Sequence, residues 1–201
     1  MATFAQIEAM KTVFCTGAFF LMLFLISCGN EEEKQADKGV AVSQQSFRYS
    51  ADFHSRLNAS LEAYFLLKDA FVASDTIAVN KAAKLLRGQL DSLSLEELRS
   101  NDSTAFAAVN GRPGDILAEL DALLAEASLQ EKRSSFEMIS TAFYDLLRTL
   151  RPAGTTAYFQ YCPMAFDDKG AYWLSKTDSI RNPYFGAEML TCGEVKEILK
   201  Y

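Results

Sequence analysis

Four sulfur-bearing side chains near the C-terminal end are the residues of this sequence best suited to chemistry. Only Pro163 separates Cys162 from Met164, and Met189 precedes Cys192 by three residues. Thiolate and thioether sulfur are soft ligands that favour soft ions such as Cu(I) and Ag(I) over hard ones. We therefore expect a soft-metal site here if the chain folds so that the four sulfurs meet.

A disulfide between Cys162 and Cys192 is the alternative. In an oxidising compartment, two cysteines 30 residues apart most simply pair with each other. Closing a loop of that size contributes about 3 to 4 kcal/mol through chain entropy. Met164 and Met189 would then be core filler. The sequence leaves open a disulfide, a metal site and a switch between the two.

Two further residues are possible ligands. His54 is the only histidine of the chain, and Met138 lies in a segment with helical periodicity. A single histidine limits base catalysis, and the sequence has no GxSxG, HExxH, P-loop or GxGxxG motif. We therefore expect a protein that is not an enzyme.

Apolar residues recur at helical spacing in four segments and predict a mainly α fold, an antiparallel bundle of about four helices. The four stripes lie within residues 57–72, 79–93, 116–127 and 136–150. Residues 110–114 (NGRPG) are the strongest helix breaker between them. Short links of this kind favour helices that run up and down beside one another.

Polar residues at the expected helix starts support this arrangement. Asp75 is placed to cap the second helix. Ser94 with Glu97, and Ser128 with Glu131, have the spacing of a capping box, in which hydroxyl and carboxylate satisfy each other's backbone amides.

The sequence changes character after Gly154. Residues 156–162 and 171–174 have strand propensity, and a turn at 167–170 separates them. We expect a small β-hairpin and loop subregion over residues 155–201, which carries the four sulfurs.

The N-terminal segment is typical of an exported protein. Residues 12–26 form an uncharged run that is too short to span a bilayer, which needs about 20 apolar residues. Lys11 precedes the run, and translation from Met10 would place this charge at the new terminus. The sequence Leu-Ile-Ser-Cys at 25–28 is similar to a bacterial lipobox, in which Cys28 is acylated and anchors the protein in the membrane.

These observations give a domain organisation. We expect a lipoprotein signal peptide at 1–27, a lipidated flexible tether at 28–50, and one helical-bundle domain at 51–201. The net charge of −6 does not favour nucleic-acid binding. A lipid-anchored protein of the cell envelope fits best, at the outer membrane on its periplasmic or its surface face.

The C-terminal region also resembles a known family. The similarity lies in residues 161–165 (YCPMA), 172–175 (YWLS), 180–186 (IRNPYFG) and 189–193 (MLTCG), with helical matches at 64–70 and 133–140. They resemble an uncharacterised bacterial domain family, found as small exported proteins or lipoproteins and fused to periplasmic adaptor subunits of heavy-metal efflux pumps. The resemblance implies soft-metal handling and an efflux adaptor as partner. Where family members carry extra imidazoles, this chain has Ser134, Ser135 and Phe136, which leaves a sulfur-only site.

Two functions remain from the sequence. The first is an envelope lipoprotein that binds Cu(I) or Ag(I) and supports heavy-metal handling or efflux. The second is a disulfide-braced, non-catalytic interaction module of an envelope complex, which docks through a surface formed by aromatic side chains. These are Tyr158, Tyr161, Tyr172, Trp173, Tyr184 and Phe185.

Overall fold

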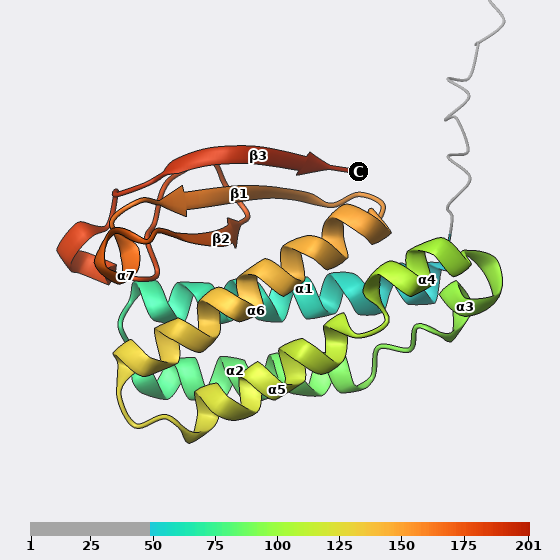
Figure 1. Ribbon diagram of the computed structural model, residues 1–201, viewed down its shortest axis with the longest axis horizontal. Coiled ribbons are helices and arrows are strands. Elements are labelled where there is room, and N and C mark those ends of the chain that lie inside the picture. The colour runs from blue at the N-terminus through green and yellow to red at the C-terminus, as the bar shows by residue number, and fades with distance from the viewer. Residues whose placement is uncertain (1–48) are drawn as a thin grey trace, which may run out of the picture. The chain divides into compact units, whose positions relative to one another are not determined.

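The computed structural model describes residues 49–201, which are mainly helical and end in a small three-stranded antiparallel sheet (Figure 1). The expected fold class is confirmed as mainly α with a small C-terminal β region. The signal peptide at 1–27, the acylated Cys28 and nearly all of the expected tether at 28–50 lie outside the described residues. Predictions about them remain predictions.

Four long helices correspond to the four apolar stripes. They are α1 (Ala51–Val72), α2 (Thr76–Asp91), α5 (Arg112–Ala125) and α6 (Leu129–Leu150). Contacts join α1 to α2, α2 to α5, and α5 to α6. The third of these helices begins at Arg112, inside the expected breaker, because proline is tolerated in the first turn, where no helical partner exists for its missing N–H.

Side-chain caps fix two of the helix starts as expected. Asp75 accepts hydrogen bonds from the amides of Ile77 and Ala78 at the start of α2. Ser128 and Glu131 form a complete capping box at the start of α6. Each cap satisfies backbone donors that would otherwise lack a partner, which contributes about 1 kcal/mol.

The capping box expected at Ser94 and Glu97 is wrong. The short helix α3 (Glu96–Asn101) has no side-chain cap, and the Glu97 carboxylate instead accepts hydrogen bonds from the backbone amide and hydroxyl of Ser50. Ser50 is the N-cap of α1, so Glu97 ties the start of that helix to α3.

The link between α2 and α5 is partly helical, with α3 followed by α4 (Ser103–Val109). The Tyr49 hydroxyl donates to Asp102, the N-cap of α4. Tyr49 is buried and packs on the ring of Phe53. The folded part therefore includes Tyr49, one residue of the expected tether at 28–50.

Aromatic rings form the centre of the core between α1 and α6. Tyr64 stacks on Phe136 with ring centroids 5.5 Å apart, and Phe71 lies 4.8 Å from the same ring. Phe136 is fully buried, so its truncation to alanine would cost about 3 to 5 kcal/mol. Tyr184, from the C-terminal region, contacts Phe136 at 5.9 Å and joins that region to the helical core.

The sheet has β1 (Thr156–Cys162) at its centre, between β2 (Ala171–Ser175) and β3 (Glu194–Lys200). Both neighbours pair antiparallel with β1. The expected hairpin is thus present as β1 and β2. The third strand was not anticipated.

The sheet packs against the helices, with β2 nearest to them in Figure 1. The ring of Tyr144 on α6 stacks on Phe159 at 3.8 Å, and Phe159 stacks on Tyr172 at 4.8 Å. The Tyr64 hydroxyl, on α1, accepts a hydrogen bond from the backbone amide of Leu174. These contacts hold β1 and β2 in a fixed position, and β1 carries Cys162.

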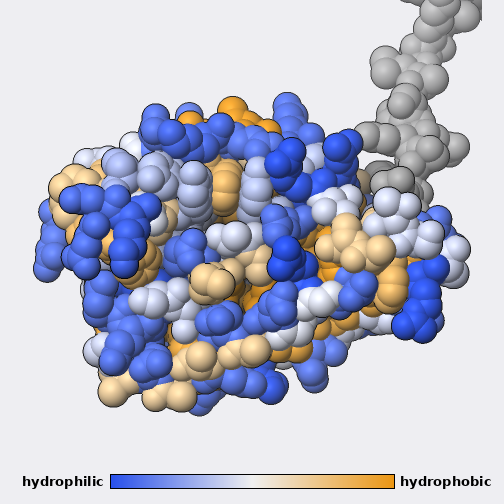
Figure 2. Space-filling view, viewed as in Figure 1, coloured by the Kyte–Doolittle hydropathy of each residue, from blue (hydrophilic) through white to orange (hydrophobic). Residues whose placement is uncertain are grey.

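The surface of the described part is mixed. In the face shown in Figure 2, hydrophilic side chains alternate with apolar ones along the helices. The exposed large apolar side chains are spread over several parts of the fold: Leu66, Ile77, Leu85, Met138, Met164 and Ile198. None of the helices in residues 49–201 is both long and apolar enough to cross a membrane.

Candidate metal centre

The fold brings the two C-terminal cysteines into contact. Cys162 ends β1 and is buried, whereas Cys192 lies in the segment just before β3 and is partly exposed. Both are free cysteines, and their Sγ atoms lie 2.8 Å apart. This separation is longer than the about 2.05 Å of a disulfide bond and shorter than the spacing of two sulfurs that share a metal ion.

The segment between β2 and β3, residues 176–193, carries Cys192 and covers one face of the sheet. We call it the covering segment. Strand register places Cys162, Gln160 and Trp173 on this face. The Gln160 side-chain amide donates to the backbone carbonyl groups of Thr177 and Asp178 and so holds the segment against the sheet. Cys162 is therefore enclosed between the sheet and this covering segment.

Asn182 organises the covering segment. Its side-chain amide donates to the carbonyl of Cys192 at 3.0 Å, and its carbonyl oxygen accepts from the amide of Tyr184 at 2.8 Å. Its backbone amide donates to the carbonyl of Leu190. Asn182 is fully buried, so these bonds have no competition from water. Sequence reasoning did not single out this residue.

Gly193 allows Cys192 to approach the sheet closely. Its φ of +141° lies in a region that other residues rarely adopt. A Cβ atom at this position would lie 2.8 Å from the backbone oxygen of Tyr161 and 2.9 Å from the ring of Trp173. A glycine is needed there for the sulfurs to meet.

Met164 and Met189 lie beside the cysteine pair. Both line an open cavity of about 480 Å³, together with aromatic residues that include Phe166 and Tyr184. The backbone amide of Met164 is directed at the thiol of Cys192, and the carbonyl of Met189 accepts from the amide of Cys192. The structure therefore brings the two cysteine sulfurs together, and Met164 and Met189 line a cavity that neither cysteine lines.

A left-handed turn follows Met164. Phe166, Asp167 and Asp168 all have positive φ, between 53° and 64°, in a region that costs non-glycine residues about 1 to 2 kcal/mol each. The amide of Gly170 donates to the carbonyl of Ala165 and closes the turn. The Phe166 ring packs edge-on against Tyr184, which fixes the turn over the cavity. The sequence indicated a turn here but not its handedness.

The thiol of Cys192 is held protonated at neutral pH. Its hydrogen bond with Cys162, followed by burial and the nearby Cys162 sulfur, raises the pKa of Cys192 to about 11. A metal ion that binds this sulfur must displace a proton, so binding is expected to strengthen as the pH rises.

The two possible further ligands lie elsewhere. The His54 ring accepts a hydrogen bond from the amide of Ala153, before the start of β1, whereas Cys162 lies at the other end of that strand, which is roughly 20 Å long. Met138 lines a different cavity between α5 and α6, beside Arg112 and Asp145. Neither is brought to the cysteine pair. Within residues 49–201, no three or more His, Cys, Asp and Glu side chains are grouped so that they could hold a metal ion.

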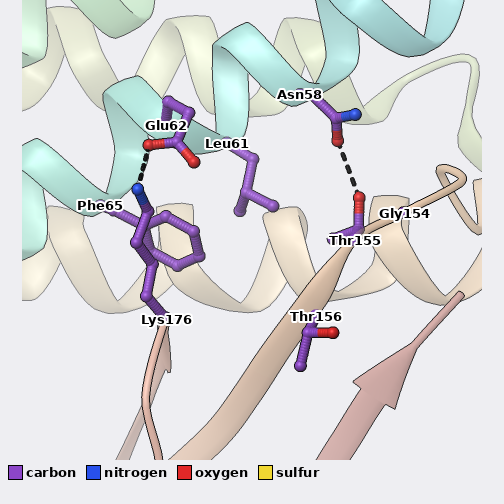
Figure 3. Close-up of a pocket in the computed structure, with 8 residues that line it drawn as sticks. All are labelled: Asn58, Leu61, Glu62, Phe65, Gly154, Thr155, Thr156 and Lys176. Atoms are coloured by element: carbon purple, nitrogen blue, oxygen red, sulfur yellow. Dashed lines mark hydrogen bonds and ion pairs between the residues drawn. The ribbon is translucent and has the colours of Figure 1, made fainter.

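A third cavity lies between α1 and the sheet (Figure 3). An ion pair between Glu62 and Lys176 and a 2.8 Å hydrogen bond between Asn58 and Thr155 cross it. Its floor includes Phe65, over whose ring the Lys176 ammonium lies. These polar groups already partner one another, so this cavity is a weaker candidate for function than the pair formed by Cys162 and Cys192.

The aromatic residues expected at a docking surface are largely structural. Trp173 and Tyr184 are buried, at 0% and 3% exposure, and their rings contact each other edge-on. The rings of Tyr172 and Tyr161 contact each other at a tilt on the sheet, with centroids 4.5 Å apart, and both residues are partly buried. Tyr158, Tyr161, Tyr172 and Trp173 lie on β1 and β2, whereas Tyr184 and Phe185 lie in the turn before Gly186. Local sequence does not reveal which face another segment covers.

Comparison with known proteins gives one family. Residues 61–154 match the family described as a protein of unknown function, DUF3347. The matched range runs from α1 to just before β1, so it contains most of the helical part and none of the four sulfur residues. No curated protein and no solved structure shows significant similarity to this chain.

Proposed function

We propose that this protein binds a soft metal ion, Cu(I) or Ag(I), between the sulfurs of Cys162 and Cys192. The observation that carries the proposal is the 2.8 Å contact between the two thiol sulfurs, which come from distant parts of the chain. Met164 and Met189, which line a common cavity, would supply thioether sulfur. All four donors are soft, as Cu(I) prefers.

Small movements suffice to admit an ion between the two thiols. The sulfurs must separate by about 1 Å to share a metal, which side-chain rotation provides without moving β1 or the hydrogen bond from Asn182 to Cys192. Both thiols lose their protons on binding. The half-exposed side chain of Met164 forms the solvent side of the site, where an ion from another carrier would arrive.

The wider role that fits such a site is soft-metal handling in the cell envelope. The lipobox at 25–28 would anchor the protein, and the segment at 28–48 would give the folded part reach from the membrane surface. The protein would then hold Cu(I) away from other targets or pass it to an efflux adaptor, without catalysing a reaction.

A competition titration tests the proposal. Full-length protein with Cys15 and Cys28 replaced by serine carries thiols only at Cys162 and Cys192, and it is titrated reduced and without oxygen against a Cu(I) chelator. We expect one Cu(I) per chain to be taken from the chelator. Replacing both Cys162 and Cys192 with serine should abolish this binding.

Methionine variants provide a matched control. Met164→Leu and Met189→Leu should each weaken Cu(I) binding by about tenfold, because a thioether ligand is lost while the apolar volume is kept. Met138→Leu changes an equally exposed methionine outside the site and should have no effect. Binding that survives the double serine variant would overturn the proposal.

The same sulfur contact favours a second candidate, a disulfide-braced interaction module. The sulfurs need approach by less than about 1 Å to form a bond. A disulfide here would tie the covering segment to β1. Counting free thiols on protein purified without reductant separates the candidates: none at these positions supports the disulfide, and two support the metal site.

A further inference from the structure

Cys162 and Cys192 differ in their access to solvent although their sulfurs touch. Cys162 is fully buried at 0% exposure, whereas Cys192 is partly exposed at the edge of the covering segment. A reactant from solvent therefore reaches the Cys192 sulfur first. The Cys162 sulfur lies 2.8 Å behind it. Redox-active cysteine pairs have this arrangement, in which the accessible sulfur reacts with the oxidant and the other resolves the product.

The surroundings favour reaction within this pair over other outcomes. Cys162 is fixed by the pairing of β1 with β2, opposite Ala171. The backbone of Cys192 is fixed by Asn182 and by the carbonyl of Met189. Because both backbones are held, an oxidised Cys192 meets the buried Cys162 before it meets a thiol on another molecule.

We infer that this pair is also an oxidation site, at which a hydroperoxide converts the dithiol to a Cys162–Cys192 disulfide and so switches off metal binding. The inference rests on the proposed function, because it names the regulation of the same site.

The reaction has two balanced steps with hydrogen peroxide as oxidant. The Cys192 thiol first releases its proton, and the thiolate attacks one peroxide oxygen. The O–O bond breaks, and the departing hydroxide takes up a proton and leaves as water, which gives a sulfenic acid at Cys192. The Cys162 sulfur then attacks the Cys192 sulfur, the S–O bond breaks, and a second water leaves. The two thiols lose two protons and two electrons, and the peroxide is reduced to two waters.

Metal binding and oxidation exclude each other. A disulfide has no thiolate to offer a metal ion, and thiolates bound to a metal are not available to attack peroxide. Oxidation therefore releases the ion, and a bound ion protects the pair. By thermodynamic linkage, a protein in which oxidation weakens metal binding must also be one in which bound metal disfavours oxidation.

Peroxide oxidation of the reduced protein, with and without one equivalent of Ag(I), tests the inference. The full-length chain with Cys15→Ser and Cys28→Ser is used, since it leaves only this pair of thiols, and Ag(I) is chosen because it is not a reductant of peroxide. Intact mass and peptide mapping report the product. Competition with a Cu(I) chelator then reports metal binding before oxidation, after it, and after treatment with dithiothreitol.

We expect a monomer lighter by two hydrogen atoms, with the new bond mapped to Cys162 and Cys192. Ag(I) should slow its formation at least tenfold. The oxidised protein should bind Cu(I) no better than the double serine variant, and the reductant should restore binding. In Cys162→Ser, Cys192 should stop at the sulfenic acid, and in Cys192→Ser the buried Cys162 should stay reduced.

Disulfide-linked dimers, a higher oxide at Cys192 beside an intact Cys162 thiol, or oxidation unaffected by bound Ag(I) would overturn the inference while leaving the proposed metal site intact. If the reduced protein binds neither Ag(I) nor Cu(I) yet forms the internal disulfide, the proposed function fails, and the regulatory role fails with it.

Discussion

Replacing Cys162 with alanine should make Cys192 react faster with an alkylating agent, by up to about 100-fold at pH 8. In the wild-type protein the Cys162 thiol is the largest cause of the raised pKa of Cys192, about 11 against an ordinary value of 9.0. At pH 8, a pKa of about 11 leaves roughly one thiol in a thousand as thiolate, and a pKa near 9 leaves roughly one in ten. The thiolate is the reactive form. Residual burial of Cys192 keeps the gain between about tenfold and a hundredfold.

Iodoacetamide labelling followed by peptide mapping measures this rate at Cys192 alone. The same labelling in concentrated guanidinium chloride is the matched control, because the unfolded wild-type and variant chains should then react equally. Fluorescence of Trp173, the only tryptophan, shows that the variant remains folded. Equal native-state rates in the two proteins would refute the reasoning, since the sulfurs would then not be in contact.

Three further changes test the structure around the site. Asn182→Ala leaves the carbonyl of Cys192 and the backbone amide of Tyr184 buried without partners. Chemical unfolding should therefore show that the free energy of unfolding falls by about 2 to 4 kcal/mol, and Cu(I) binding should weaken. Unchanged stability would contradict the assigned bonds. Tyr64→Phe removes the acceptor of the Leu174 amide and should cost about 1 to 2 kcal/mol while Cu(I) affinity stays the same, which separates a structural effect from one on the site. Arg151→Gly should raise the free energy of unfolding by about 0.5 to 1 kcal/mol, because Arg151 ends α6 in a left-handed conformation that glycine adopts without strain; a lower melting temperature would argue against this.

The helical part could be predicted from sequence because its signals are local. Apolar residues at three- and four-residue spacing located α1, α2, α5 and α6, and Ser128 marked the start of the last of these. The short helices α3 and α4 were missed because a segment of six or seven residues carries too few apolar positions to establish a period.

The sheet was predicted only in part. β1 and β2 are rich in aromatic residues and were found, whereas β3 (EVKEILK) has charged residues that suit a helix as well as a strand. Its strand conformation follows from pairing with β1, which lies about 40 residues earlier in the chain. Such long-range pairing has no local signature.

The candidate site has some features with a local sequence signal and others that depend on long-range contacts. The residue types indicated soft sulfur ligands, and the structure brings Cys162 and Cys192 into contact. Their meeting depends on Asn182 and Gly193, which act through backbone contacts across the covering segment. The exclusion of His54 and Met138 from the cluster likewise follows from tertiary packing, because each lies on a helix face that points to another part of the fold.

The most direct test of the metal-binding claim is X-ray absorption at the copper edge on reduced protein that carries one Cu(I) per chain, in the background without Cys15 and Cys28. The account predicts a first coordination shell made only of sulfur, with copper lost from the protein in which Cys162 and Cys192 are both serine. A first shell of nitrogen or oxygen, or copper that is retained by the double serine variant, would contradict it.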